Sequence, residues 1–179
     1  MREQGIASRR DEWVAYGAAI WAVAFAGVNI YLQIVGIDSA QIERRWATFT
    51  AINLSVVVLK AFGAAAALAT VQRWGRAIST RVVSVCMWGA AATLLLYAGF
   101  GLLAVAIAGD LLGWTLAGGT FYMPILAYLG FFVVGGPLFA VAAGQYRHRT
   151  GAPLRWVVLG ALGAPLLLGA VLLGTSAVF

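Results

Sequence analysis

The sequence predicts an all-α fold: an integral membrane helical bundle of five transmembrane helices, with the N-terminus inside the cell and the C-terminus outside. The chain has 179 residues, of which 63% are hydrophobic and 10% charged, whereas ordinary soluble domains carry about 25% charged residues. A soluble core of this length cannot hide so much apolar surface, so lipid must cover part of it. The apolar runs are continuous rather than alternating with period two, which favours helices over the strands of a membrane barrel.

Each apolar run is long enough for a helix to cross the hydrocarbon core, which takes about 20 residues. The first run is longer than the hydrophobic region of a signal peptide, so we expect an uncleaved first span. The composition marks no linker and no second domain. We therefore expect one transmembrane domain over residues 1–179, with spans at about 14–36, 47–71, 82–108, 121–144 and 156–178.

The arginines predict the orientation, because basic residues in short loops favour the cytoplasmic side. In a five-span chain, the segments before the first span and after the second and fourth spans share one side. They hold Arg2, Arg9, Arg10, Arg73, Arg76, Arg81, Arg147, Arg149 and Arg155. The other side holds Arg44 and Arg45. We expect a multi-pass protein of the cell membrane, with its N-terminus in the cytoplasm.

Lys60 is the main candidate for a functional residue. It lies near the middle of the second span, in the run WATFTAINLSVVVLKAFGAAAALATVQ. A cation at the centre of a spanning helix costs about 2.5 kcal/mol or more, so such a residue is a functional candidate by default. Three fates are open to it. It is neutral in a dry environment, it lines a small wet cavity that attracts an anion or a lipid headgroup, or its stem carries the charge toward an interface.

The fourth span offers hydrogen-bond acceptors for Lys60. Gly135, Gly136 and Pro137 fall at the same depth as the lysine. Because proline lacks an N–H, Pro137 should free the carbonyl of Val133. We expect the lysine to point into the bundle and to donate to such freed carbonyls.

Other polar residues lie at a comparable depth. Thr93 and Tyr97 of the third span are expected to assist Lys60. Asn29 and Asn53 lie at one depth on sequential helices. Asparagine side chains hydrogen-bond between spans, so this pair is either a packing clamp, which we favour, or part of a ligand contact.

Small residues recur at four-residue spacing, which lets helix backbones approach closely within the bundle or between copies of the chain. These residues are Gly63 and Ala67, then Gly136, Ala140 and Gly144, and finally Gly160 and Ala164. Pro137 and Pro165 lie within spans and should bend their helices, as hinges or as static kinks.

Several functions are disfavoured by the residues present. The net charge of +6 comes from arginines between apolar runs, which is typical of topology signals rather than of nucleic-acid binding. One cysteine, Cys86, and one histidine, His148, do not suffice for a disulfide, a multi-histidine metal site or paired haem ligands. We therefore expect no metal and no cofactor, and we find no catalytic constellation for an enzyme.

The segments RWGRAISTR and MWGAAATLLLYAGFGLL, and later LAYLGFFVVGGPLFAVAAGQYRHRT, resemble small multi-spanning membrane proteins of high-GC, actinobacterial-type bacteria whose function is not established. The likeness covers about the second half of the chain. Members of that group often carry Tyr-Trp near the end of the first span, where this chain reads IYLQIVG. The resemblance implies the same membrane topology and no particular activity.

Two functions follow from these patterns. The first is a membrane protein that binds or moves a small solute or a lipid through a polar site around Lys60. The second is an accessory or structural subunit whose small residues pack against a partner. The expected partners are the lipid bilayer and either a second copy of the chain or another membrane protein, and no nucleic acid.

Overall fold

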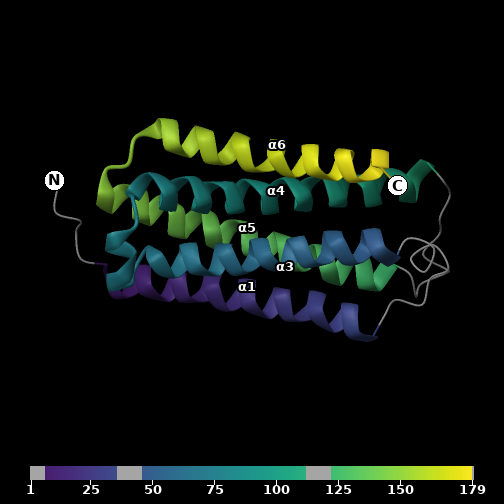
Figure 1. The fold of residues 1–179 in the computed structure, drawn as a ribbon, viewed down its shortest axis with the longest axis horizontal. Coiled ribbons are helices and arrows are strands. Elements are labelled where there is room, and N and C mark those ends of the chain that lie inside the picture. The colour runs from purple at the N-terminus through teal and green to yellow at the C-terminus, as the bar shows by residue number, and fades with distance from the viewer. Residues whose placement is uncertain (1–6, 36–45, 112–121, 179) are drawn as a thin grey trace.

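The computed structural model describes residues 7–35, 46–111 and 122–178, and within these ranges the chain is helical and contains no strand. The described residues form five long helices and one short 3-10 helix, which confirms the predicted all-helical bundle (Figure 1). The elements are α1 (Arg9–Val35), α3 (Trp46–Ala69), η1 (Arg73–Ala77), α4 (Thr80–Leu111), α5 (Tyr122–Thr150) and α6 (Leu154–Val178).

The helices run alternately up and down along the long axis of the molecule. Figure 1 shows α1, α4 and α6 starting at one end, where η1 and the α5–α6 turn also lie, whereas the C-terminal end of α6 lies at the opposite end. We call the end at which α1, α4 and α6 start the arginine-rich end, because its segments contain Arg9, Arg73, Arg81, Arg147 and Arg155. The predicted connection that holds Arg44 and Arg45 lies outside the described residues.

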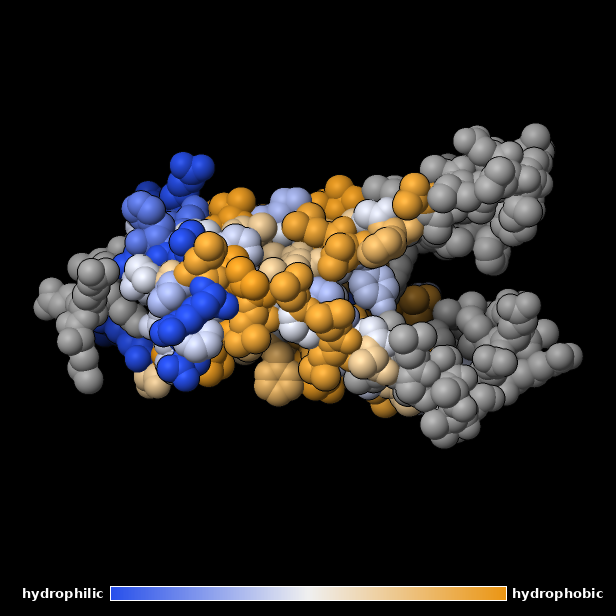
Figure 2. Space-filling view, turned by 90° about the horizontal axis from the view of Figure 1, so that it is seen from above, coloured by the Kyte–Doolittle hydropathy of each residue, from blue (hydrophilic) through white to orange (hydrophobic). Residues whose placement is uncertain are grey.

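Three helical segments are long and apolar enough to cross a membrane: Arg9–Val35, Thr50–Ala69 and Thr80–Phe100. Within the described side chains, a shorter apolar helical segment follows at Leu154–Ala170. The surface fits a lipid environment, since large apolar side chains such as Ile20, Phe62 and Leu166 are about two-thirds exposed or more. Figure 2 shows hydrophobic residues over the middle of the molecule and hydrophilic ones gathered at the arginine-rich end.

The core is built from small side chains on several helices. Ala18, Ala22 and Ala67 are almost completely buried, and Met87 of α4 and Phe139 of α5 pack into the same cluster. Helix α3 packs mainly against α1, α5 contacts both α1 and α4, and α6 packs along α4. Lipid tails are as apolar as leucine, so close backbone approach and van der Waals packing hold such helices together.

Three of the four glycines at four-residue spacing, Gly63, Gly136 and Gly160, lie against neighbouring helices, whereas a Cβ at Gly144 would meet nothing within 4 Å. A Cβ added at Gly160 of α6 would lie 2.5 Å from the carbonyl oxygen of Val85 in α4, and one added at Gly89 would lie 2.8 Å from Cβ of Ala164. Gly63 of α3 similarly faces the ring of Phe139. At these positions the small residues serve contacts between helices of one chain.

The prolines do not interrupt their helices. Pro137 lies within α5 and Pro165 within α6, and both helices continue on either side. The two glycines before Pro137 make room for neighbouring side chains. A Cβ at Gly135 would overlap the ring of Trp21, and one at Gly136 would lie 2.7 Å from Leu95. Helix α5 can therefore approach α1 and α4 at the same level.

Polar contacts tie three helices together at the arginine-rich end. Ser8 and Asp11 exchange hydrogen bonds at the start of α1, which satisfies N–H groups that have no partner within the helix. Arg149 of α5 lies 3.4 Å from the Asp11 carboxylate and donates to the carbonyl of Thr70, 2.8 Å away, just beyond α3. Arg149, one of the arginines that predict the orientation, therefore also joins α1, α3 and α5.

Candidate functional site

Lys60 is buried between α1 and α3, where its ammonium group contacts α1. It is 8% exposed. Its Nζ donates to Oδ1 of Asn29 and to the carbonyl oxygen of Phe25, the latter at 3.4 Å. It also lies 3.1 Å from the centroid of the Phe25 ring, where a cation meets the negative face of the π-system. Helix α1 therefore supplies the contacts that the described residues give this cation.

The Phe25 ring lies between the cation and a cluster of aromatic side chains. Phe131 of α5 stacks on it, with ring centroids 4.8 Å apart and an interplanar angle of 7°. Phe132 meets it edge-on at 5.2 Å. A stacked ring and an ammonium at these distances cannot share one face, so Lys60 and Phe131 lie on opposite faces of Phe25. The lysine thus has an apolar aromatic wall on one side.

A chain of hydrogen-bonded amides continues from Lys60. Asn29 Nδ2 donates to Asn53 Oδ1 at 2.6 Å, and Asn53 Nδ2 donates to the Asn29 carbonyl at 2.9 Å. Asn53 Nδ2 also donates to Gln33 Oε1 at 3.1 Å, and Gln33 Nε2 donates to Thr50 Oγ1 at 2.9 Å. These residues, Lys60, Asn29, Asn53, Gln33 and Thr50, form what we call the polar ladder.

The polar ladder occupies only one half of the α1–α3 interface. It runs from Lys60 to Thr50, which lies near the start of α3 and away from the arginine-rich end. Toward the arginine-rich end, the buried side chains of α1 and α3 include the alanines of one core cluster: Ala18, Ala19, Ala22, Ala64 and Ala67. At the exposed end of the pair, Gln72, just beyond α3, donates to the Tyr16 hydroxyl at 2.6 Å. Burial decreases along the ladder, from Lys60, Asn29 and Asn53 to the half-buried Gln33 and Thr50.

The direction of the Lys60 side chain follows from helix geometry. Asn29 pairs with Asn53 and Gln33 with Thr50, and continuing this antiparallel register places the Lys60 backbone opposite that of Ala22. Cα–Cβ bonds tilt toward the N-terminus of their own helix. The lysine on α3 and the asparagine on α1 therefore lean toward each other. The lysine stem extends away from the arginine-rich end, so that its ammonium group donates a hydrogen bond to Asn29 Oδ1.

This direction corrects the predicted partners of Lys60. The predicted depth of Lys60, level with Gly135, is consistent with this register. The Lys60 backbone lies opposite Ala22, and Trp21, the residue before Ala22, packs on Gly135. The expected acceptors are wrong, since the acceptors of Lys60 belong to α1 rather than to the α5 carbonyl of Val133. The stem leans away from that level of α5, and the Phe25 ring lies between the ammonium group and Phe131.

Thr93 and Tyr97 also lie elsewhere. Tyr97 stacks on Phe132, with ring centroids 5.6 Å apart, and is 41% exposed. Thr93 is half-buried on α4, whereas the two hydrogen-bond acceptors and the aromatic ring that meet the Lys60 ammonium belong to α1. The structure therefore brings Lys60, Asn29 and Asn53 together and leaves the two α4 residues outside the ladder.

Sequence reasoning missed Gln33, Thr50 and Phe25. Gln33 lies four residues after Asn29, and Thr50 three residues before Asn53, so both fall on the helix face that carries the asparagines. That spacing was a usable signal. The carbonyl and ring of Phe25 gave none, because a phenylalanine in an apolar run is ordinarily core.

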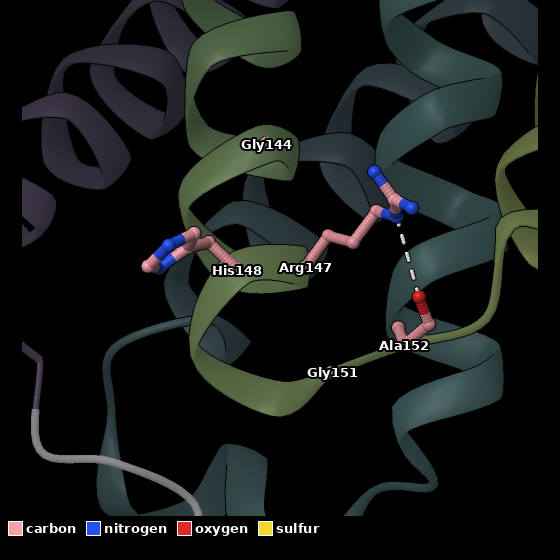
Figure 3. A pocket seen from close by; sticks show the side chains of 5 residues that line it. All are labelled: Gly144, Arg147, His148, Gly151 and Ala152. Atoms are coloured by element: carbon pink, nitrogen blue, oxygen red, sulfur yellow. Dashed lines mark hydrogen bonds between the residues drawn. The ribbon is translucent and has the colours of Figure 1, made fainter.

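A second polar feature lies at the arginine-rich end, where a pocket of about 390 Å³ is lined by Gly144, Arg147, His148, Gly151 and Ala152. Arg147 Nε donates to the carbonyl of Ala152 at 3.3 Å. Figure 3 shows His148 pointing to the opposite side of the helix from Arg147. Gly151 has a φ of 64° and its N–H bonds to the Arg147 carbonyl, so these contacts mainly close the C-terminal end of α5.

Among the described residues, no group of three or more His, Cys, Asp or Glu side chains is placed to hold a metal ion. Comparisons with protein-family models, with curated proteins and with solved structures find no match.

Proposed function

We propose that this chain is a five-span protein of the cell membrane, with the arginine-rich end in the cytoplasm, that binds a small polar or anionic ligand at Lys60 from the outer side. The ligand class is a solute or lipid headgroup with a carboxylate, phosphate or hydroxyl group. The observation that carries this proposal is the one-sided polar ladder, whose hydrogen bonds continue from Lys60 to Thr50 in the outer half of the α1–α3 interface.

The one-sidedness favours binding over transport across the whole membrane. A translocated polar solute needs hydrogen-bonding groups along its full route, since each unsatisfied group in an apolar environment costs several kcal/mol. On the cytoplasmic side of Lys60, α1 and α3 contribute the buried alanines Ala18, Ala22 and Ala67 to one apolar cluster, and the Gln72–Tyr16 hydrogen bond lies beyond it at the exposed end. A ligand that enters between the helices therefore reaches Lys60 and stops there.

The polar ladder also suggests how a ligand is accommodated. A lysine ammonium has three donors and an asparagine side chain has both donors and an acceptor. A carboxylate or phosphate can take the place of the Asn29 oxygen beside Lys60, while the released asparagine amides donate to its remaining oxygens. Such an exchange keeps the buried polar groups paired, which limits its cost.

The membrane topology has a direct test. A reporter that is active only outside the cytoplasm is fused after residue 179, and a matched fusion is made within the α5–α6 turn. The proposal requires signal from the first fusion and silence from the second. Silence after residue 179 would contradict the five-span orientation.

Ligand binding is tested by thermal unfolding in detergent, with acetate, inorganic phosphate, glycerol phosphate and glycerol as probes. A bound ligand raises the unfolding temperature because it stabilises the folded state. We expect at least one probe to stabilise the wild-type protein but not Lys60→Met. Ser55→Ala is the matched control, because the Ser55 hydroxyl donates to the Ala51 carbonyl of its own helix.

The accessory-subunit function is the alternative outcome of the same experiment. If Lys60→Met raises the stability, no probe distinguishes it from the wild type, and a stoichiometric membrane partner co-purifies, the ladder is a packing clamp. Of the glycines that motivated this alternative, Gly63, Gly136 and Gly160 contact helices of the same chain, whereas a Cβ at Gly144 would meet nothing within 4 Å. Most of the small-residue positions are therefore used within the bundle.

A further inference from the structure

We propose that the α4–α6 pair binds a phosphate group at the cytoplasmic membrane surface, through Arg81 and Arg155 held on Trp156. This inference uses the membrane placement proposed above and is independent of Lys60. The three residues, which we call the Arg–Trp–Arg cluster, lie in the first turns of α4 and α6. Trp156 is half-buried, and both arginines are exposed.

One indole ring holds both guanidinium groups. The guanidinium carbon of Arg81 lies 4.5 Å from the ring centroid of Trp156, and that of Arg155 lies 4.8 Å from it. Stacking on an aromatic face orients a planar guanidinium while its N–H groups remain available at the edge. Two like charges are thereby kept within about 9 Å of each other, which is unfavourable without an anion.

The helix ends add to this positive field. Figure 1 shows α4 and α6 starting side by side at the arginine-rich end, and their close approach at Gly89 and Gly160 keeps them together. A helix N-terminus carries a partial positive charge and normally attracts acidic residues. The first turns of α4 and α6 contain no acid and instead carry Arg81 and Arg155.

No carboxylate in the described part of the chain neutralises the cluster. The ion pair that the described residues do form joins Arg149 of α5 to Asp11 of α1. Arginine recognises phosphate oxygens with paired N–H donors, more specifically than a point charge does. Two arginines held on one indole ring, beside two helix N-termini, therefore match the charge of a phosphate group and offer it N–H donors.

The surface next to the cluster favours a phosphate that carries acyl chains. Val82 of α4 and Val158 and Leu162 of α6 follow the arginines along the two helices, and each is about half exposed or more. Acyl chains can lie against these side chains while the headgroup meets the arginines. An anionic phospholipid and a soluble phosphate share the same binding chemistry, and the experiment separates the two sources.

The test uses the full-length protein in a neutral detergent and native mass spectrometry. Phosphatidylglycerol is titrated against phosphatidylcholine with the same acyl chains, and the first bound lipid is quantified. Two basic residues near a membrane surface contribute about 1 kcal/mol each, so Arg81→Gln/Arg155→Gln should weaken the binding of phosphatidylglycerol about 30-fold. Phosphatidylcholine binding should hardly change.

The matched control removes two other arginines from the same end. Arg73 and Arg76 are exposed residues of η1, so Arg73→Gln/Arg76→Gln changes the net charge equally and leaves the cluster intact. We expect less than a threefold effect from this control. Equal losses in both double variants would overturn the proposal, because they would show a general charge effect rather than a site.

Two further arms complete the test. Trp156→Leu keeps both charges but removes their platform, so it should weaken phosphatidylglycerol binding about tenfold, and it replaces the double variant if that variant does not fold. Inorganic phosphate is added as a competitor. Binding of inorganic phosphate that depends on Arg81 and Arg155, without lipid binding, identifies a soluble phosphate as the source. Failure of the wild-type protein to bind either probe overturns the proposal.

Discussion

Asn29 and Asn53 are joined by two hydrogen bonds across the α1–α3 interface: the Asn29 amide donates to the Asn53 side-chain oxygen, and the Asn53 amide donates to the Asn29 backbone carbonyl. The remaining oxygen of Asn29 accepts from Lys60. The favoured packing clamp is therefore the same structure as the candidate site. A residue pair that fixes the register of two helices also holds the buried cation, so stability and binding should respond to the same substitutions.

The first prediction concerns the coupling between Asn29 and Lys60. Asn29→Leu removes an acceptor from a buried ammonium, and a charged group left without a partner costs about 1–3 kcal/mol or more. We expect Asn29→Leu to lower the free energy of unfolding by that amount. The double variant Asn29→Leu/Lys60→Met should recover at least about 1 kcal/mol of this unfolding free energy, because no buried ammonium is then left without its hydrogen-bond acceptor.

Reversible unfolding in mixed micelles measures these free energies for the wild type, both single variants and the double variant. A coupling energy near zero, with the two single effects simply adding, would show that Lys60 and Asn29 do not depend on each other. Ser55→Ala again serves as the control, since its hydroxyl bonds within α3.

The second prediction concerns the α4–α6 contact. Gly160→Ala places a methyl group 2.5 Å from the Val85 carbonyl oxygen, and overpacking of this kind costs about 1–3 kcal/mol. Gly163→Ala, in the same helix, meets nothing within 4 Å. It should be neutral or stabilising, because alanine is the better helix former. The shift in unfolding temperature should therefore be clearly negative for Gly160→Ala and close to zero or positive for Gly163→Ala. Equal shifts for the two variants would rule out the close contact between Gly160 and Val85.

The third prediction concerns Arg149, which joins three helices. Arg149→Leu loses both the Asp11 carboxylate and the Thr70 carbonyl, so we expect a loss of about 1–3 kcal/mol in unfolding free energy. Asp11→Asn keeps a hydrogen-bonding side chain beside Ser8 and removes only the charge, so it should cost less than about 1 kcal/mol. A larger effect of Asp11→Asn than of Arg149→Leu in the same unfolding assay would contradict this division of roles.

The helices and their level in the bundle could be predicted from the sequence because both depend on long patterns. The continuous apolar runs predicted the five helices to within a few residues of their observed ends, with two exceptions. Polar residues extend α1 back to Arg9, and they extend α5, the predicted fourth span, on to Thr150. Helices continue past the apolar run when polar side chains can cap them, as Ser8 and Asp11 do.

The partner of Lys60 could not be predicted in the same way. Depth along the membrane normal is one coordinate, whereas the direction of a side chain depends on helix rotation and on the tilt of Cα–Cβ bonds. Depth matching led to Pro137 and Val133, while the rotation of α1 presents Phe25 and Asn29. Reading the faces of the two antiparallel helices together would have predicted Gln33 and Thr50 as well.

The side from which Lys60 can be reached tests the central claim most directly. Lys60 is the chain's lone lysine, so a small membrane-impermeant amine reagent marks it unambiguously once the N-terminal amine is separated by peptide mass. The account predicts labelling of Lys60 when the reagent is outside sealed right-side-out vesicles, and at least fivefold less labelling in inverted ones. Labelling only from the cytoplasmic side, or from neither side, would contradict it.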